Sequence, residues 1–276
     1  MGECSENQQT SRTLRYVACV SYPRSGHHLT QRVLSDYFQQ DFRYCQYGIK
    51  THEDCCQAYP CTHPMVTMTK NHDQELDRPN TKGIAKISGL PYLVLIRNYL
   101  EATVSDYSLY LRENPDSKKA WIFFSKYRAK YYQRFVQKWI FSKDSLEKLI
   151  IRYEDLTDNP VFVYNQIIAY FHSSWPIDQM RLEQVIKGAS LENQTSHGAE
   201  LIPGFGVHNR RRLEDFKYFD TKHFALLEVL LSKELAELGY ENRFARKPYK
   251  LTLFGHQYRI PQFPGIPWKA PVQPRE

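Results

Sequence analysis

The segment that decides the fold is VACVSYPRSGHHLTQRVL, residues 17–34. Its apolar run 17–20 ends at the sequence PRSG (23–26). After this loop Leu29, Val33 and Leu34 recur at the spacing of one helix face. The pattern predicts a strand, a short loop and a helix.

The loop between this strand and helix has the features of an anion site. The first N–H groups of a helix are unpaired, and the positive end of the helix dipole lies behind them. Gly26 lets the backbone approach a phosphate closely, and Arg24 contributes a forked charge. Side-chain donors are offered by Ser25, His27, His28 and Thr30. We interpret the loop as a phosphate site, the alternative being an ordinary turn with a solvated arginine.

The common nucleotide loop, GxxxxGK[ST], is absent at this junction. The segment has one glycine where that loop has two, and no Lys-Ser/Thr pair to serve phosphate and magnesium. The sequence therefore predicts a phosphate site that works without a metal. An ATP-dependent small-molecule kinase of the P-loop type is the second hypothesis, and this missing pair argues against it.

Length and composition predict a single, ordinary globular domain. The chain has 276 residues, which is long enough to bury a full hydrophobic core. Its hydrophobic fraction of 42% and charged fraction of 24% are ordinary for a globular protein. No apolar stretch approaches the roughly 18 residues of a membrane span. The first 16 residues lack the apolar centre of a secretory signal. These features predict a cytoplasmic protein without a membrane partner.

The positive charge of the chain predicts an anionic ligand. The formal net charge is +7, and basic residues are scattered apart from Arg210, Arg211 and Arg212. This distribution fits one anionic pocket. A third hypothesis, a non-enzymatic binder of nucleic acid or phosphoinositide, requires clustered basic residues with exposed aromatic side chains. The aromatic residues between 112 and 148 have core-like helical spacing, so we expect no nucleic-acid partner.

Four of the six cysteines gather in a short stretch. They are Cys45, Cys55, Cys56 and Cys61, accompanied by His52 and His63. Zinc sites show such density, but no paired CxxC or HxxxH spacing occurs here. We interpret these cysteines as free thiols and predict no metal.

The remaining elements predict an α/β fold with a central parallel sheet flanked by helices. Further strands are expected at 65–69, 92–96 and 149–153, with helical stretches at 112–148, 161–171, 178–188 and 221–238, the last ending at Gly239. Strands separated by helices indicate parallel pairing, and such sheets bind ligands at the carboxyl ends of their strands. Arg24, His72, Arg97 and Tyr153 are predicted to lie at those ends. The segment 41–64 is expected to be irregular.

The chain divides into three parts by composition. Residues 1–13 are polar and predicted to be disordered. Residues 14–243 form the domain. Residues 244–276 contain six prolines among aromatic residues, and we expect a strap that lies on the domain.

Four motifs, in order, resemble those of the cytosolic-type sulfotransferases that use 3′-phosphoadenosine 5′-phosphosulfate (PAPS). The family's YPKSGTTW is matched by YPRSGHHL (22–29), and its RNPKDVAVSYY by RNYLEATVSDY (97–107). Its KTH-like triplet is matched by KNH (70–72), and its YEDL by residues 153–156. Together they span about 140 residues of the chain. The resemblance implies the P-loop-like sulfotransferase fold.

The resemblance also implies roles for individual residues. Direct in-line transfer would use His72 as general base and Lys70, Arg24 and His28 to stabilise charge. The 5′-phosphosulfate would be held by Arg24 and by the loop residues Ser25, Gly26, His27, His28 and Leu29. The 3′-phosphate would be held by Arg97, Ser105 and the basic residues Arg210, Arg211 and Arg212. Tyr153 would lie near the adenine.

The sequence departs from the family at several positions. The lysine of the family's YPKSGTTW motif is replaced by Arg24, which alters how a proton reaches the leaving group. The two threonines of that motif are replaced by His27 and His28, so either histidine is an alternative acid or base. The dimer motif KxxxTVxxxE survives only as Lys217 and Thr221, which leaves the oligomeric state open.

The acceptor is expected to be a small molecule. Its site should be lined by residues 41–64, 106–128 and the tail, where aromatic residues alternate with Glu53, Asp54, Asp106, Glu113 and Asp116. This mixture favours a cationic or polyhydroxylated acceptor, loosely resembling those of natural-product sulfotransferases of saxitoxin-type biosynthesis. Hydroxyl and nitrogen acceptors are both left open.

Overall fold

The computed structural model describes residues 14–47, 58–78, 80–172, 174, 176–192, 212–245, 250–253 and 256–259. The predicted disorder of residues 1–13 lies outside these ranges, as does most of the predicted strap. Within the tail the backbone forms two antiparallel strands, β6 (Lys250–Leu253) and β7 (His256–Arg259). The strap therefore stays a prediction.

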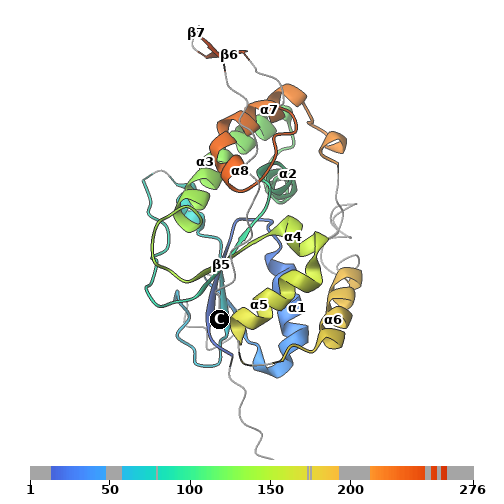
Figure 1. Ribbon diagram of the computed structural model, residues 1–276. Coiled ribbons are helices and arrows are strands. Elements are labelled where there is room, and N and C mark those ends of the chain that lie inside the picture. Colours follow the sequence, from blue (N-terminus) through green and yellow to red (C-terminus); the bar gives the residue numbers. More distant parts are fainter. Residues whose placement is uncertain are drawn as a thin grey trace, which may run out of the picture.

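A five-stranded, wholly parallel sheet forms the centre of the domain (Figure 1). The strand order is β2-β3-β1-β4-β5. The strands are β1 (Val17–Ser21), β2 (Tyr44–Gln46), β3 (Met68–Asn71), β4 (Tyr92–Ile96) and β5 (Lys148–Arg152). Every residue of β1, β3 and β4 is buried, as expected for strands covered on both faces. The predicted parallel α/β architecture is confirmed.

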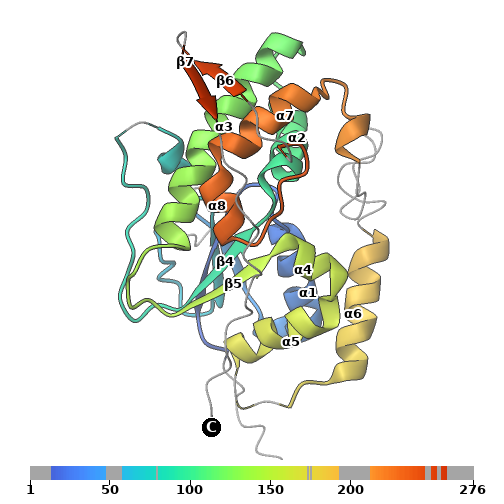
Figure 2. The same ribbon diagram turned by 45° about the horizontal axis from the view of Figure 1, so that its top comes forward.

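One face of the sheet is covered by α1 (His27–Phe38), α5 (Pro160–Phe171) and α6 (Gln179–Glu192) (Figures 1 and 2). Alternate residues of the central strands, among them Val17 and Cys19 of β1 and Leu93 of β4, pack into this layer. The short α4 (Tyr153–Asp158) connects β5 to α5.

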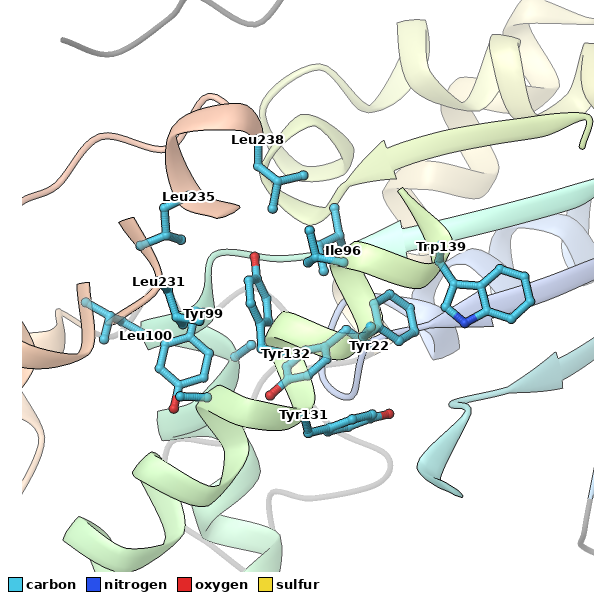
Figure 3. Close-up of a cluster of buried hydrophobic side chains, with 14 of the residues drawn as sticks. Tyr22, Ile96, Tyr99, Leu100, Tyr131, Tyr132, Trp139, Leu231, Leu235 and Leu238 are labelled. Atoms are coloured by element: carbon cyan, nitrogen blue, oxygen red, sulfur yellow. The ribbon is translucent and has the colours of Figure 1, made fainter. Parts of the chain in front are cut away.

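The opposite face is covered by α2 (Tyr99–Tyr110), α3 (Lys118–Trp139), α7 (Thr221–Leu230) and α8 (Ser232–Glu237). Figure 3 shows Tyr22 and Ile96 packing with Tyr131, Tyr132 and other side chains of this layer. The aromatic residues of α3 are mostly core, as predicted; Phe123 and Tyr127 are exposed exceptions.

Several predicted element boundaries were wrong. The helical stretch 112–148 is helical only over α3, because Ser117 caps its start by accepting from the Ala120 N–H and a loop after residue 140 leads to β5. The stretch 221–238 is two helices separated at Leu231, and Gly239 follows at a positive φ of 74° as the predicted cap.

The predicted strand at 65–69 was also misplaced, and one strand was missed. β3 begins at Met68 and extends through Lys70 and Asn71, two polar residues that the sheet buries. β2 occupies three residues of the stretch expected to be irregular. In the part of the chain that the structure describes, short 3₁₀ turns occur at Gln39–Asp41, Gln74–Asp77 and η3 (Leu213–Asp215). Among the described residues, no helix is long and apolar enough to cross a membrane.

Candidate functional site

The candidate site lies at the carboxyl-terminal edge of the sheet. Arg24 follows β1, His72 follows β3, Arg97 follows β4 and Tyr153 follows β5. Because the strands are parallel, these four residues meet at one edge, as the sequence predicted. The strand order reverses around β1, so this edge is also the topological switch point.

Gly26 fixes the shape of the loop between β1 and α1. It precedes α1 with φ 86° and ψ 13°, a left-handed conformation that glycine adopts without steric cost. A Cβ placed on Gly26 would lie 2.7 Å from Cδ2 of Tyr153. The loop therefore needs glycine both for its turn and for its close approach to α4.

Arg24 connects this loop to α2. Its Nε donates to Oγ of Ser105 at 2.9 Å, and its backbone oxygen accepts from Nη1 of Arg97 at 3.3 Å. Burial lowers the pKa of the Arg24 guanidinium, while the Asp106 carboxylate opposes that shift. Arg24, assigned by the resemblance to the 5′-phosphosulfate, thus contacts both Arg97 and Ser105, assigned to the 3′-phosphate.

Oγ of Ser25 and Nε of Arg97 are buried in this loop region and have no hydrogen-bond partner among the described residues. The Arg97 guanidinium lies 4.2 Å from the centroid of the Tyr153 ring, so stacking fixes its plane. An unpaired buried donor costs free energy that an anionic ligand would offset. Both atoms are therefore suited to bind an anion.

His72 is held in one tautomer. Its Nδ1 lies 2.7 Å from the backbone oxygen of Ser21, which only accepts, so Nδ1 carries the proton and Nε2 is a bare acceptor. Burial lowers the pKa of His72 to about 3, so the ring is neutral. The next residue, Asp73, is fully buried and accepts from Lys138 at 2.6 Å and from Trp139 at 2.8 Å, which anchors this segment to α3.

His27 and His28 have different environments. His27 is buried, with Nδ1 3.3 Å from Sγ of Cys19 and Nε2 3.2 Å from the hydroxyl of Tyr44, so both ring nitrogens are engaged. Burial lowers its pKa well below the usual value. His28 is exposed, and its Nε2 lies 3.5 Å from Nζ of Lys70. Of the two imidazoles, only that of His28 is exposed.

A cavity of about 670 Å³ brings most of the predicted residues together. The predicted residues on its wall are Arg24, Gly26, His27, His28, Leu29, Lys70, His72, Arg97, Ser105, Tyr153 and Arg212. Ser25 is buried in the same loop but is not on the wall, and the side chain of Leu29 packs in the core. Arg210 and Arg211 lie outside the described residues. The functional roles of all these residues remain predictions.

The structure adds residues that sequence reasoning missed. They include Gln46, Gln74, Glu101, Arg128 and, after η3, Phe216. Arg128 bridges Asp106, which was expected at the acceptor site, at 2.7 Å and Asp77 at 3.1 Å. The signal for Arg128 was present in the sequence, since it is a charged residue at the helical spacing of buried Phe124 and Tyr131.

Part of the expected acceptor lining is not found at the cavity. Glu113 and Asp116 are not on its wall, and Asp116 pairs with Lys217 at 2.6 Å, while Glu53 and Asp54 fall outside the described residues. Cys19, Cys45 and Cys61 are free thiols. In the described ranges no group of three or more His, Cys, Asp or Glu side chains could hold a metal ion.

Comparisons with known proteins rest on structure. No family model and no curated protein sequence matches the chain. The chain is similar to the crystal structure of mouse sulfotransferase SULT7A1 complexed with PAP, with a TM-score of 0.56 and 17% identity over 80% of this chain and 84% of that one. A sulfotransferase domain from the curacin biosynthetic pathway aligns with a TM-score of 0.46 and 14% identity over 84% of this chain and 99% of that one. The first comparison shows that this chain has the fold of a sulfotransferase.

Proposed function

We propose that this protein is a sulfotransferase that uses PAPS as donor and a small molecule as acceptor. One observation carries the proposal: four motifs far apart in the sequence meet around one cavity at the ligand-binding edge of the sheet. A solved structure of similar fold is a PAP complex, which supports the same donor here.

The residues present fit such a donor. Arg97, Ser105 and Arg212 would hold the 3′-phosphate, and Arg24 with the first amides of α1 would hold the 5′-phosphosulfate. The Nε of Arg97, which has no hydrogen-bond partner among the described residues, could donate to a phosphate oxygen. When bound, PAPS supplies the sulfuryl group and is released as adenosine 3′,5′-bisphosphate.

The chain's own groups would handle proton and charge. Nε2 of His72 accepts the acceptor's proton, because the Ser21 carbonyl fixes the proton on Nδ1. Arg24, the loop amides and Lys70 stabilise the negative charge that develops during transfer. Positioning and electrostatics suffice, since no covalent enzyme intermediate is needed.

For the acceptor we propose a polar, hydroxylated molecule rather than a cation. Three acidic side chains line the cavity in the described structure: Glu101, Asp106 and Asp215. Glu101 pairs with Arg243 at 2.7 Å, and Asp106 pairs with Arg128 at 2.7 Å. Two of the three acidic charges are thus neutralised by the protein and attract a cationic acceptor weakly, so hydrogen bonding is the better basis for recognition.

Calorimetric titration with adenosine 3′,5′-bisphosphate tests the donor. We expect metal-independent binding, weakened at least about tenfold in Arg97→Ala, because a buried cation opposite a phosphate contributes about 1.5 to 3 kcal/mol. Arg43→Ala is the matched control, since Arg43 is exposed and does not line the cavity. This control should leave the affinity unchanged.

Titration with ADP and magnesium is the competing measurement. Preference for ADP with magnesium would overturn the proposal and favour the kinase hypothesis. Equal weakening by the Arg97 and Arg43 variants would show that bisphosphate binds elsewhere. Turnover of PAPS with a panel of acceptors then tests the acceptor class, and turnover confined to protein or glycan acceptors would contradict a small molecule.

A further inference from the structure

Lys70 is a buried cation, and among the described residues no ion pair joins it to a carboxylate. Its side chain lies at the cavity wall, and the residue is 4% exposed. A buried charge is costly unless it is paired. The position therefore favours either loss of the proton or arrival of an anionic ligand.

The imidazole of His28 lies within hydrogen-bonding distance of the Lys70 ammonium. Nζ of Lys70 and Nε2 of His28 are 3.5 Å apart. An ammonium has only donors, so Nε2 of His28 must accept, which leaves the imidazole neutral with its proton on Nδ1. Two positive charges at this distance would repel each other strongly, so only one of the two side chains is positively charged at a time.

Arg24 cannot serve as the acid in this site. A guanidinium does not release its proton in proteins, and Nε of Arg24 already donates to Ser105. His28 is exposed at the start of α1, where the amides of the first turn attract an anion. Lys70 behind it is screened from solvent.

We propose that Lys70 and His28 form a proton-sharing pair that protonates the leaving oxygen of the donor. This inference rests on the proposed sulfotransferase function. As the bond from sulfur to the acceptor forms, the bond from sulfur to the bridging oxygen breaks, and its electron pair stays on that oxygen. The oxygen takes the Nδ1 proton of His28, while Lys70 passes a proton to Nε2. His72 holds the proton of the acceptor and solvent restores the pair, so protons balance.

The charged and titratable groups that surround Lys70 favour sharing of its proton with His28. Burial, with a smaller contribution from the Arg24 charge, lowers the pKa of Lys70 to about 8. Burial raises the pKa of the Cys19 thiol, so that group is neutral. The groups facing Lys70 are Cys19 from β1, Arg24 from the loop, His27 and His28 from α1, and His72 after β3. The proton is therefore exchanged near neutral pH by this pair.

Histidine NMR on the full-length protein tests the pair. The imidazole signals of His28, assigned with His28→Thr, should show a step near pH 8 when Lys70 loses its proton. Adenosine 3′,5′-bisphosphate should move this step upward by about one pH unit or more, because a phosphate dianion stabilises the protonated pair. Lys70→Arg keeps the charge without titrating in this range, so the step should disappear.

The outcomes separate this inference from the proposed function. His28 signals that are unchanged in Lys70→Arg, or a step that bisphosphate does not move although it binds, would overturn the pair alone. Absence of any response to bisphosphate in every histidine signal would overturn the proposed donor. His172, which follows α5 and does not line the cavity, is the internal control and should not respond.

Discussion

Arg24 and Gly26 both have positive φ angles, 66° and 86°, on the two sides of Ser25. For arginine this conformation is strained, and strain of this kind concentrates in ligand-binding loops. The sequence predicted the loop, its arginine and its glycine, because PRSG between a strand and a helix is a local signal. The contact of Gly26 with Tyr153 could not be predicted, since it joins segments more than 120 residues apart.

Gly26→Ala should destabilise the protein by about 2 to 4 kcal/mol, from the left-handed backbone and from overlap with Tyr153. Urea unfolding measures this change. Gly188→Ala is the matched control, because Gly188 lies in α6 with nothing within 4 Å of an added Cβ. It should stabilise the helix by up to about 1 kcal/mol. Similar effects of the two substitutions would contradict the geometry of the loop.

His72 should make the protein less stable in acid. Burial depresses its pKa from 6.5 to about 3, so below pH 6.5 the unfolded chain binds a proton that the folded chain does not. The contribution of His72 to the free energy of unfolding is therefore fully present above pH 6.5 and is lost as the pH decreases towards 3. Between pH 7 and pH 5 the loss from His72 is up to about 2 kcal/mol.

The variant His72→Asn tests this prediction, because asparagine still donates to the Ser21 carbonyl but does not titrate. Denaturant unfolding at pH 7 and pH 5 should show a smaller acid loss in the variant than in the wild type. Equal losses would mean that His72 is protonated in the folded state.

The junction of β5 with α4 positions α2. The Glu154 carboxylate accepts from the N–H of Asn98 at 3.0 Å and from the Tyr240 hydroxyl at 2.8 Å, while the Tyr132 hydroxyl donates to the Arg97 carbonyl at 3.1 Å. Three distant segments thus help to fix the backbone at the start of α2. The strand-helix junctions were predictable from apolar runs followed by helical spacing, whereas these tertiary bonds carry no local signal. The same reason explains why the three-residue β2 was missed.

Glu154→Ala should weaken bisphosphate binding about tenfold and cost about 2 to 3 kcal/mol of stability, because it leaves a buried N–H and a buried hydroxyl unpaired beside Arg97. Calorimetry and urea unfolding measure the two effects. Tyr240→Phe removes one of the two bonds but keeps the contact with Asn98. It should cost about 1 kcal/mol and leave the affinity within twofold. An affinity loss in both variants would show that Glu154 does not act through α2.

At the scale of the whole molecule, two hydrophobic cores lie on opposite faces of the sheet, and the cavity lies at the edge between them. Its wall takes residues from α1 and β3 on one side and from α2, α3 and the segment after η3 on the other. Periodicity predicted the parallel sheet and the edge that binds ligand. Residues of α3 and η3 reach the cavity wall only because of how the helices pack against one another. Sequence periodicity does not specify that packing.

Because a ligand in this cavity would contact both sides, its binding should stabilise the whole domain. At a bisphosphate concentration 100 times Kd the expected gain is about 2.7 kcal/mol. This corresponds to an increase in Tm of about 5 °C or more for a chain of this size. Thermal unfolding followed by circular dichroism measures it. A second, unshifted transition in the presence of bisphosphate would show that one core unfolds independently of the site.

The basic wall of the cavity should also affect the rate at which an anionic ligand associates. Six lysine and arginine side chains line it, Arg24, Lys70, Arg97, Arg128, Arg212 and Lys217, against three acidic ones, Glu101, Asp106 and Asp215, so the wall keeps an excess of positive charge in a chain whose net charge is +7. Such a field attracts a polyanion from beyond contact distance and accelerates its capture, an effect that salt screens over about 10 Å at 0.1 M. The encounter rate of a nucleotide donor should therefore fall steeply with ionic strength, while its escape rate changes little.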